Sequence, residues 1–385
     1  YTTYMANLVV SEEALNGTVP SWGAEEVWRV LRPCGGMMCI GRPEGAGDGL
    51  TAATLEAWAK RGGVQEAGVD VDDGLWLTAR RGAVPGAGEW TQLYADAGHT
   101  ACSNDYLRGP MAIQWFGDPG PRDMVDRHHR PMASLFKNGR LHITGDDKVI
   151  TVDAYNGFPL WEADLPGARR VGTMKNAGER LLTDDALYVA VDGECRALDP
   201  ATGAQLRTIA MPRIEETINE WGYLNSTDGL LIGTGQISGA SFDELALATV
   251  HMLEGDFRPV VVSRCIFAVD RHTGEKQWTW QRGAIMNSMI TVADGRVYFL
   301  ESRNDRAMSE SAQRGRMRVD HFCRENAWLV ALDLKRGKKV WERPVELPFQ
   351  HIAYLNGKDG VLLASGSYND EDKVFYDLLA FDMAT

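Results

Sequence analysis

The chain has 385 residues, enough for two or three ordinary domains by the usual domain size. Its formal net charge of −13 at pH 7 argues against nucleic acid or an anionic membrane surface as the main partner. No apolar stretch approaches the roughly 18 residues that a membrane-spanning helix needs, so no membrane span is predicted.

Residues 1–81 are predicted to form an α/β unit. Ala24, Val27 and Leu31 share one face of a helix because they are spaced three and four residues apart. The predicted elements are a strand, a helix, a strand, a helix and a hairpin, at residues 6–10, 24–31, 37–40, 51–61 and 69–78. This alternation predicts a partial Rossmann-like α/β fold, in which a parallel sheet has an antiparallel edge.

One segment of this unit resembles a known family. Residues 27–36 read Val-Trp-Arg-Val-Leu-Arg-Pro-Cys-Gly-Gly and are similar to a helix-to-strand segment of class I S-adenosylmethionine-dependent methyltransferases. In that family an arginine-valine-leucine-x-proline-glycine-glycine signature follows the fourth strand, and Cys34 departs from it as an insertion. The resemblance covers the C-terminal half of the methyltransferase-like domain. It implies S-adenosylmethionine as a cofactor of the full-length protein.

The candidate cofactor contacts are Ser11 and Glu12, which follow the first predicted strand. They would lie at the carboxyl end of the sheet, where ligands bind in folds of this kind. The alternative is an ordinary helix start, where the helix dipole favours acidic residues. The family's glycine-rich loop and ribose-binding acid would precede Tyr1, so we expect the chain to be an internal fragment of a longer protein.

The segment 82–88 is rich in glycine and proline and is predicted to be a linker. The periodicity of the apolar residues changes after it. The predicted domains are therefore residues 1–81, a linker at 82–88 and a second domain at 89–385.

A sequence repeat dominates this second domain. Each copy has an Asp, three residues, a Gly, three residues and then a Trp, and each follows a short apolar segment. Complete copies run from Asp153 to Trp161, Asp270 to Trp278 and Asp333 to Trp341. In a fourth copy, which begins at Asp199, Arg207 replaces the Trp, and a fifth begins at Asp382. A repeat of this size is typical of solenoids and propellers.

The residue types favour a propeller blade. The apolar segments do not alternate strictly, which predicts strands buried on both faces. The Asp is expected to cap a tight turn, the Gly to supply a left-handed backbone position, and the Trp to point outward and cover the sheet. Another strand pair lies upstream, for example at 180–183 and 186–190, so each repeat predicts four antiparallel strands. The alternative is a β-sandwich.

The repeat resembles the pyrroloquinoline-quinone (PQQ) type, whose core is alanine-leucine-aspartate-x-x-threonine-glycine-x-x-x-tryptophan. The best copies are 330–341 and 267–278, and the resemblance covers about residues 90–385. It implies an incomplete all-β propeller of four-stranded antiparallel blades. Residues 111–115 are expected to form an outer strand with Trp115 in the motif position. The motif is specific for the fold and not for an activity.

Aligning the repeats places the end of the second strand of each blade on one rim of the propeller. Two long connections, at about 239–264 and 306–326, are predicted on the same rim, where binding sites are common. Residues 306–318 are expected to be mobile. The rim candidates, together with two histidines of a polar cluster at 123–130, are His128, His129, Gln236, Glu301, Arg303, Asn304, Asp305, Tyr368, Asn369 and Asp370. The alternative is that these are ordinary polar loop residues.

Three functions are compatible with these features. The first is a methyltransferase whose propeller binds a protein or a small-molecule ligand on one face. The second is a non-catalytic propeller scaffold with a degenerate methyltransferase fold. The third is a quinone-dependent dehydrogenase, which is disfavoured because the chain has no adjacent-cysteine pair. We expect no metal site, no nucleic-acid partner, and no tight binding of PQQ with calcium or of S-adenosylmethionine by this chain alone.

Overall fold

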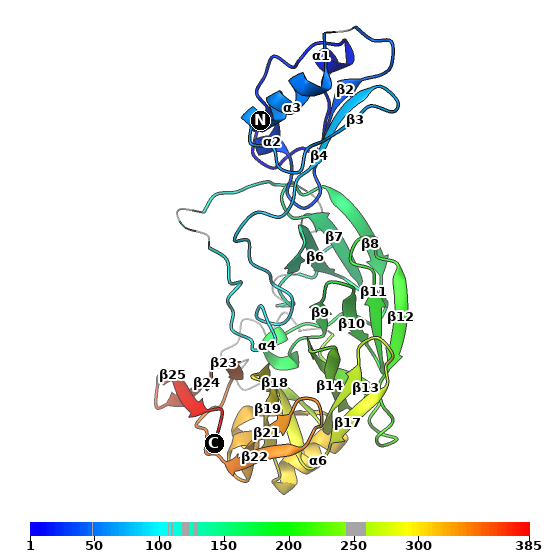
Figure 1. Ribbon diagram of the computed structural model, residues 1–385. Helices are drawn as coiled ribbons and strands as arrows, with labels where there is room; N and C mark the ends of the chain where they lie inside the picture. The colour runs from blue at the N-terminus through cyan, green and yellow to red at the C-terminus, as the bar shows by residue number, and fades with distance from the viewer. Residues whose placement is uncertain are drawn as a thin grey trace.

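The computed structural model describes residues 1–47, 49–106, 108, 111–117, 120, 123–126, 130–243 and 259–385. Figure 1 shows a small N-terminal α/β unit followed by a series of β-sheets that are arranged in an arc. His128 and His129 lie outside the described residues. No helix among the described residues is long and apolar enough to cross a membrane.

The α/β unit contains a four-stranded sheet. Its elements are β1 (Leu8–Val9), α1 (Glu12–Leu15), α2 (Ala24–Val30), β2 (Met37–Arg42), α3 (Ala52–Arg61), β3 (Gly68–Asp70) and β4 (Leu75–Arg80). The strand order is β1-β2-β4-β3; β1 and β2 are parallel, and β4 is antiparallel to both of its neighbours. Thr51 caps α3 through a reciprocal capping box with Thr54. The predicted order of elements is therefore present, with the short α1 in addition.

The described residues of the repeat region form five antiparallel sheets, which we call blades 1 to 5. In each of the first four, the third strand carries the apolar segment and the fourth carries the Trp or Arg of the motif. Blade 4 is extended by β15 (Val260–Ser263) and β20 (Arg316–Met317), and blade 5 has three strands. The blade strands are β5 (Leu135–Lys137), β6 (Arg140–Gly145), β7 (Lys148–Asp153), β8 (Pro159–Asp164), β9 (Arg180–Leu182), β10 (Leu187–Val191), β11 (Glu194–Leu198), β12 (Gln205–Ala210), β13 (Glu220–Thr227), β14 (Leu230–Gln236), β16 (Cys265–Asp270), β17 (Lys276–Trp280), β18 (Ala284–Ala293), β19 (Arg296–Ser302), β21 (Ala327–Asp333), β22 (Lys339–Pro344), β23 (Ala353–Lys358), β24 (Val361–Asp370) and β25 (Lys373–Asp382).

The turn between the third and fourth strands has the predicted chemistry. In blade 3 the Asp270 carboxylate accepts the backbone N–H groups of His272 and Thr273, both at 2.8 Å. The backbone N–H of Gly274 closes the turn on the Asp270 carbonyl at 2.8 Å. The four motif glycines share a left-handed conformation, with φ of 73°, 75°, 74° and 62° at Gly157, Gly203, Gly274 and Gly337. The alignment of the repeats is thereby confirmed.

The motif tryptophans lie between blades, so the prediction that they point outward to cover their own sheet is wrong. The Trp278 indole N–H of blade 3 donates to the carbonyl of Leu334 in blade 4 at 2.7 Å. A Cβ added to Gly337 would lie 2.5 Å from the Trp278 ring, so the indole sits directly on that glycine. Equivalent bonds join Trp161 to Pro200 at 3.1 Å and Trp341 to Met383 at 3.0 Å. Each acceptor is the residue after the motif Asp of the next blade.

Arg207 occupies the same position in blade 2 and makes the same contact by different chemistry. Its guanidinium Nε donates to the carbonyl of Arg271 in blade 3 at 3.2 Å, as an indole N–H would. A Cβ added to Gly274 would meet Ile209 at 3.3 Å instead of an indole ring. The guanidinium also contacts the Tyr188 hydroxyl at 2.7 Å. The departure from the motif therefore preserves the bond between the blades.

Trp115 makes the contact of a motif Trp, although the residues around it do not form the predicted strand. Residues 111–117 are not in a β-strand, which corrects the expectation of an outer strand at 111–115. The Trp115 indole nevertheless donates to the Ala154 carbonyl of blade 1 at 2.9 Å and would collide with a Cβ at Gly157. The side-chain interaction was thus predictable at this position, while the backbone conformation was not.

Residues 90–99, the hub segment, bond to all five blades in succession. Backbone or side-chain hydrogen bonds link it to Phe136 at 2.9 Å, Leu182 at 2.7 Å, Ser226 at 2.8 Å, Val292 at 3.0 Å and Gly357 at 2.8 Å. Each of these partners is the last or the last-but-one residue of the innermost strand of its blade. The segment ends at His99, whose Nε2 lies 2.9 Å from the Tyr223 hydroxyl. Burial lowers the pKa of His99 to about 4, so its ring is neutral at pH 7.

A short helix near the start of the arc forms a hydrogen bond with the segment just before blade 5, at the other end of the arc. In α4 (Thr173–Asn176), which follows blade 1, the buried Lys175 ammonium donates to the His351 carbonyl at 3.0 Å, just before blade 5. Figure 1 shows α4 on the concave side of the arc. The hub segment and α4 together fix the relative positions of the innermost strands.

The connection at 306–326 is folded, so the prediction that residues 306–318 are mobile is wrong. It contains α6 (Asp305–Gln313), β20 and α7 (Val319–Cys323). β20 pairs with β15, which belongs to the other long connection. The apolar side chains of Ala307, Val319 and Phe322 are buried against blade 4, and this burial holds the connection in place.

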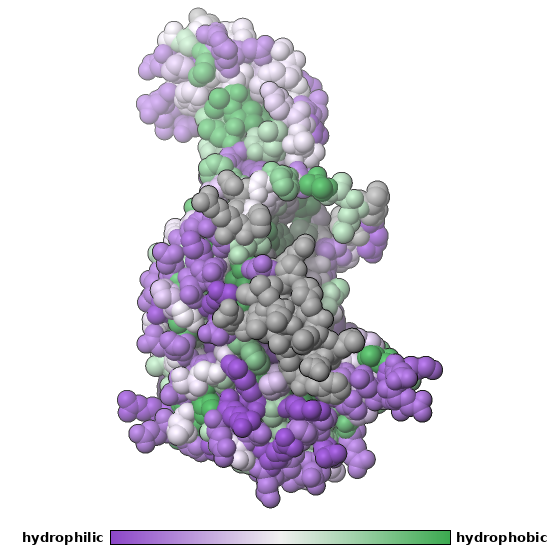
Figure 2. All heavy atoms as spheres, turned by 180° about the vertical axis from the view of Figure 1, so that it is seen from behind, coloured by the Kyte–Doolittle hydropathy of each residue, from purple (hydrophilic) through white to green (hydrophobic). Residues whose placement is uncertain are grey.

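The α/β unit contacts blade 1 through polar and aromatic groups. The Arg32 guanidinium lies 2.8 Å from the carboxylate of the motif residue Asp153, which is 1% exposed. Burial raises the pKa of Asp153 although Arg32 opposes this shift. The rings of Tyr4 and Tyr155 meet edge to face with centroids 5.5 Å apart. The α/β unit also exposes Leu8 and Val10 at the β1 edge of its sheet, and Figure 2 shows an apolar patch on this unit.

The contact between a motif glycine and an indole ring leads to a prediction about the free energy of unfolding. Gly337→Ala would put a Cβ 2.5 Å from the near end of the Trp278 side chain, which cannot move cheaply. Gly360→Ala is the matched control, because Gly360 has a φ of 79° and open space around it. We expect urea denaturation to show a loss of about 1 kcal/mol for the control and a further 1–3 kcal/mol for Gly337→Ala. Equal losses would contradict the docking contact.

The domain boundary leads to a second prediction. Residues 82–87 are largely exposed, whereas residues 305–323 are folded against blade 4. Limited digestion with a broad-specificity protease should therefore cut first within 82–88 and leave 305–323 intact. Intact mass spectrometry identifies the first fragments. Early cleavage within 305–323 with protection of 82–88 would contradict both assignments.

Candidate functional site

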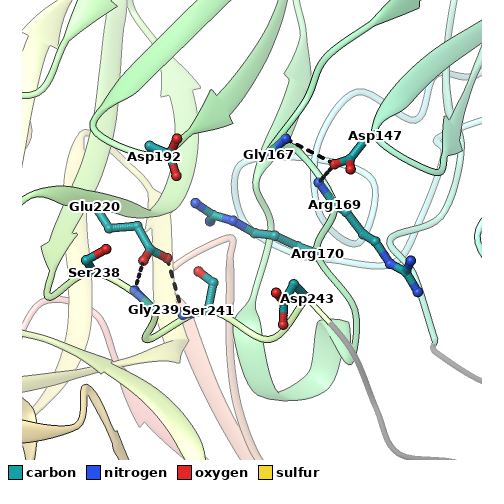
Figure 3. A pocket seen from close by; sticks show the side chains of 10 residues that line it. All are labelled: Asp147, Gly167, Arg169, Arg170, Asp192, Glu220, Ser238, Gly239, Ser241 and Asp243. Carbon is teal, nitrogen blue, oxygen red and sulfur yellow. Dashed lines mark hydrogen bonds between the residues drawn. The ribbon is translucent and has the colours of Figure 1, made fainter.

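A polar hollow of about 480 Å³ lies where the first three blades meet on the predicted rim. It is formed by the turns that follow the second strands of blades 1 and 2, by the segment after the second strand of blade 3, and by the connection between blades 1 and 2. Figure 3 shows the ten lining residues, Asp147, Gly167, Arg169, Arg170, Asp192, Glu220, Ser238, Gly239, Ser241 and Asp243. We call this feature the rim hollow.

Glu220 lines the part of the rim hollow that belongs to blade 3. This buried residue begins β13, and its carboxylate accepts the backbone N–H of Gly239 at 2.6 Å and of Ser241 at 3.2 Å. The Gln236 amide donates to the same carboxylate at 2.8 Å. Charge-assisted hydrogen bonds of this kind are among the stronger ones in proteins. Glu220 therefore holds the 237–243 segment in a fixed shape, and Figure 3 shows the two backbone bonds.

Arg170 comes from the connection between blades 1 and 2 and is 4% exposed. It donates to the carbonyl of Gly222 at 2.7 Å and also to that of Trp221. These carbonyls are available because the pairing of β13 with β14 shifts register between Trp221 and Leu224. Arg170 therefore joins the wall of the hollow to the innermost strand of blade 3.

The remaining carboxylates are presented by turns. Asp147 and Asp192 have left-handed backbones, with φ of 51° and 49°, in the turns after the second strands of blades 1 and 2. The Asp147 carboxylate accepts the backbone N–H of Arg169 at 3.0 Å. This bond fixes the connection between blades 1 and 2, which forms one wall of the hollow. The lining has four carboxylates and two arginines, and Arg169 is itself paired with Asp146 at 2.9 Å. The hollow is therefore net acidic and suits a cationic group.

Among the predicted rim residues that the structure describes, Gln236 is the one that adjoins the hollow, through its bond to Glu220. It is fully buried and joins a polar network that spans blades 3 and 4. Its amide oxygen accepts the Asn287 amide at 3.1 Å, and the Ser263 hydroxyl bonds Asn287 at 2.7 Å. Because its polar atoms bond within this network and to Glu220, Gln236 holds the Glu220 side of the hollow in place without lining the hollow itself.

Glu301 and Arg303 lie together at the end of β19. The Glu301 carboxylate, which is 0% exposed, accepts the Trp280 indole at 3.2 Å and Arg303 at 3.1 Å. Arg303 also bonds Glu342 at 2.6 Å. Burial opposes ionisation of Glu342, but hydrogen bonds from Lys339 and Arg303 outweigh it and lower the pKa of this carboxyl to about 2. These residues form an ion-pair network within blade 4.

Asn304 caps a helix. Its side-chain oxygen accepts the Ala307 N–H at 2.7 Å at the start of α6, and its amide donates to the Ser302 hydroxyl at 2.8 Å. Asp305 follows in the first turn of α6, where an acidic residue is favoured by the helix dipole. Among the described residues, no group of three or more histidine, cysteine or acidic side chains could hold a metal ion.

The remaining predicted residues lie elsewhere. Tyr368 stacks on Phe375 across the β24–β25 hairpin with ring centroids 5.5 Å apart. The Asn369 side chain lies 2.9 Å from Nε2 of His351, and Asp370 is at the exposed end of the same hairpin. Ser11 caps α1 by accepting the Ala14 N–H at 3.2 Å, and Glu12 is exposed in that helix.

Sequence reasoning missed Asp192, Glu220 and Arg170. The Asp192–Gly193 pair ends the second strand of blade 2 just as Asp147 ends that of blade 1, so a complete alignment of the blades would have found it. Glu220 precedes an apolar strand without any motif. Arg170 carries no local signal, because its role depends on a register shift in a distant strand.

Comparison with known proteins supports the repeat domain. Residues 125–234 match the family model described as Outer membrane protein assembly factor BamB. No curated protein matches the chain. The match does not extend to residues 1–81, and it covers two of the blades and the start of a third.

Similar solved structures include two natural proteins and one design. A europium-containing methanol dehydrogenase is 13% identical over 65% of this chain and 56% of that chain, with a TM-score of 0.35. BamB from Moraxella catarrhalis is 16% identical over 68% of this chain and 73% of that chain, with a TM-score of 0.28. The computationally designed Ika4 protein is 12% identical over 52% and 88%, with a TM-score of 0.30. The family match and the four-stranded antiparallel blades together support a PQQ-like, BamB-type β-propeller domain.

Proposed function

We propose that this protein is a binding protein whose propeller recognises a basic segment of a partner protein at the rim hollow. The observation that carries the proposal is the lining, in which four carboxylates and two arginines surround about 480 Å³ at the junction of three blades. Rigid β scaffolds commonly place binding residues in the turns at one end of their strands. The similarity of residues 125–234 to an assembly factor family agrees with a role in binding proteins.

The geometry of the hollow favours recognition over catalysis. Glu220 and Arg170 are occupied by bonds to the backbone, so they shape the site. Asp192 and Asp243 are exposed and can meet a cationic side chain from outside. A lysine or arginine of a partner would gain charge-assisted hydrogen bonds there, and the surrounding acidity would speed its approach. The overall charge of −13 has the same effect on a basic partner.

Calorimetric titration with a tetralysine peptide tests this proposal. Asp147→Asn/Asp192→Asn keeps a residue type that accepts the left-handed turn and removes two charges, so we expect at least a tenfold weaker affinity. The matched control is Asp228→Asn/Asp359→Asn, which makes the same change in left-handed turns between the first and second strands, at the opposite rim. No binding by the intact protein, or equal weakening by both double variants, would overturn the proposal.

A second candidate function is methyl transfer, to which the α/β unit would contribute part of an S-adenosylmethionine site. The parallel pair β1–β2, joined through α2 and followed by the reversed strand β4, favours it. Ser11 and Glu12 follow β1 at the carboxyl end of this pair. We propose them as the contacts with the methyl donor, and the residue pattern at 27–36 supports the same assignment.

Titration with S-adenosylmethionine, followed by nuclear magnetic resonance, tests the second candidate. Because two residues on one side of a site retain few contacts, we expect a dissociation constant no tighter than about 1 mM. The shifted signals should cluster around residues 11–15. An unchanged spectrum, or shifts confined to the propeller, would exclude this role for the α/β unit.

A further inference from the structure

A second hollow, of about 630 Å³, lies beside the rim hollow and has the opposite charge. The two share Ser238 and Gly239. The second hollow, which we call the arginine hollow, is otherwise formed mainly by the folded connection between β19 and β21. The charged and titratable residues of its lining are Arg306, Glu310, Arg314, Arg316, Arg318 and His321.

The composition of this lining is unusual for an acidic chain. Four arginines and one carboxylate, Glu310, line the hollow, while the whole protein has a net charge of −13. Arg318 is neutralised by Asp320, which it contacts through two nitrogens at 2.9 and 2.8 Å. Glu310 lies 3.7 Å from Arg314, which is 73% exposed and therefore weakly paired. The positive charge is consequently not balanced within the hollow.

Hydrogen bonds fix the Arg316 side chain against the backbone of residues 239–241. Its Nε donates to the Ala240 carbonyl at 2.6 Å, and one terminal nitrogen donates to the carbonyls of Gly239 and Ser241 at 2.9 and 2.5 Å. Its guanidinium carbon lies 4.0 Å from the centre of the Phe242 ring. These hydrogen bonds fix the position of the half-buried guanidinium, so Arg316 places a positive charge in the wall of the hollow, with Asp243 and Glu220 as the carboxylates that act on it.

The hollow also contains a histidine. His321 lies in α7, next to Arg318 and Arg306. Burial is the main cause that lowers its pKa; Asp320 is the strongest single charge acting on it and raises the pKa, whereas Arg306, Arg318 and Arg324 lower it. An anion bound in the hollow would lie among Arg306, Arg314 and Arg316, whose positive charges attract it.

We propose that the arginine hollow is a binding site for a small molecule that carries a diphosphate group. Arginine forms two parallel hydrogen bonds with phosphate oxygens, and the exposed guanidinium groups of Arg306 and Arg314 can supply them. Arg316 adds its positive charge and its remaining terminal nitrogen. A diphosphate concentrates several negative charges in a volume small enough to meet these groups together. The volume lies within the range of about 300–1,000 Å³ that is usual for small-ligand pockets. This proposal does not depend on recognition of a basic partner at the rim hollow.

Calorimetry with inorganic pyrophosphate at 0.15 M salt tests the proposal. We expect binding by the intact protein and at least a tenfold loss of affinity in Arg306→Gln/Arg314→Gln, because both side chains are exposed and neither holds the fold. The matched control is Arg213→Gln/Arg336→Gln, which removes the same charge from exposed positions outside the hollow and should bind as the intact protein does.

Citrate, tested in parallel, separates diphosphate recognition from general attraction of anions. Pyrophosphate should bind at least tenfold more tightly than citrate. The proposal is overturned if pyrophosphate does not bind, if citrate binds equally well, or if the control variant loses as much affinity as the variant of the hollow. Unchanged thermal unfolding of both variants shows that the comparison reports binding. Loss of pyrophosphate binding with intact tetralysine binding assigns the two ligands to separate hollows.

Discussion

The contact on which the rest of the structure depends is the docking of one blade's fourth strand onto the next blade's turn. An indole N–H reaches the carbonyl that follows the motif Asp, and the ring rests on the motif Gly, where any side chain would collide with it. The left-handed turn and the indole therefore require each other. Each such bond adds about 0.5–1.5 kcal/mol. At Trp278, where the bond is buried, losing one partner costs more because the other partner stays buried. Arg207 shows that the donor matters more than the ring.

The contacts between neighbouring blades give the rim of the propeller a fixed shape, which we call the platform. The docking contacts act at the outer edge of the blades, while the hub segment and α4 tie the inner strands. The turns that present Asp147 and Asp192 are thus held in place from both sides. The two hollows lie where blade connections meet on this platform, one acidic and one rich in arginine, and they share a wall at Ser238 and Gly239. Opposite charges side by side are expected to recognise separate ligands.

The sequence predicted features that depend on local chemistry. The Asp cap, the left-handed Gly and the four-stranded blades follow from residues within one repeat, and so do the elements of the α/β unit. Features that depend on distant contacts were missed. The indoles dock on the next blade rather than their own, and the basic stretch at 306–318 folds because apolar residues within it and just after it are buried. Glu301 and Asn304 lie at the predicted rim, but the Glu301 carboxylate pairs with Arg303 inside blade 4 and Asn304 caps α6. The site lies in connections such as the one that carries Arg170, which have no repeat signal.

A double-mutant cycle tests the docking contact most directly. Trp278→Phe removes the indole N–H, and Gly337→Ala displaces the ring from the turn. If the indole and the glycine act as one contact, the two losses in unfolding free energy will fall short of additivity by about 0.5–3 kcal/mol. The pair Trp278→Phe and Gly360→Ala, in which Gly360 lies in blade 5 away from that indole, should be additive within about 0.5 kcal/mol. Additive losses for Trp278 and Gly337 would contradict the account that interlocked blades hold the rim.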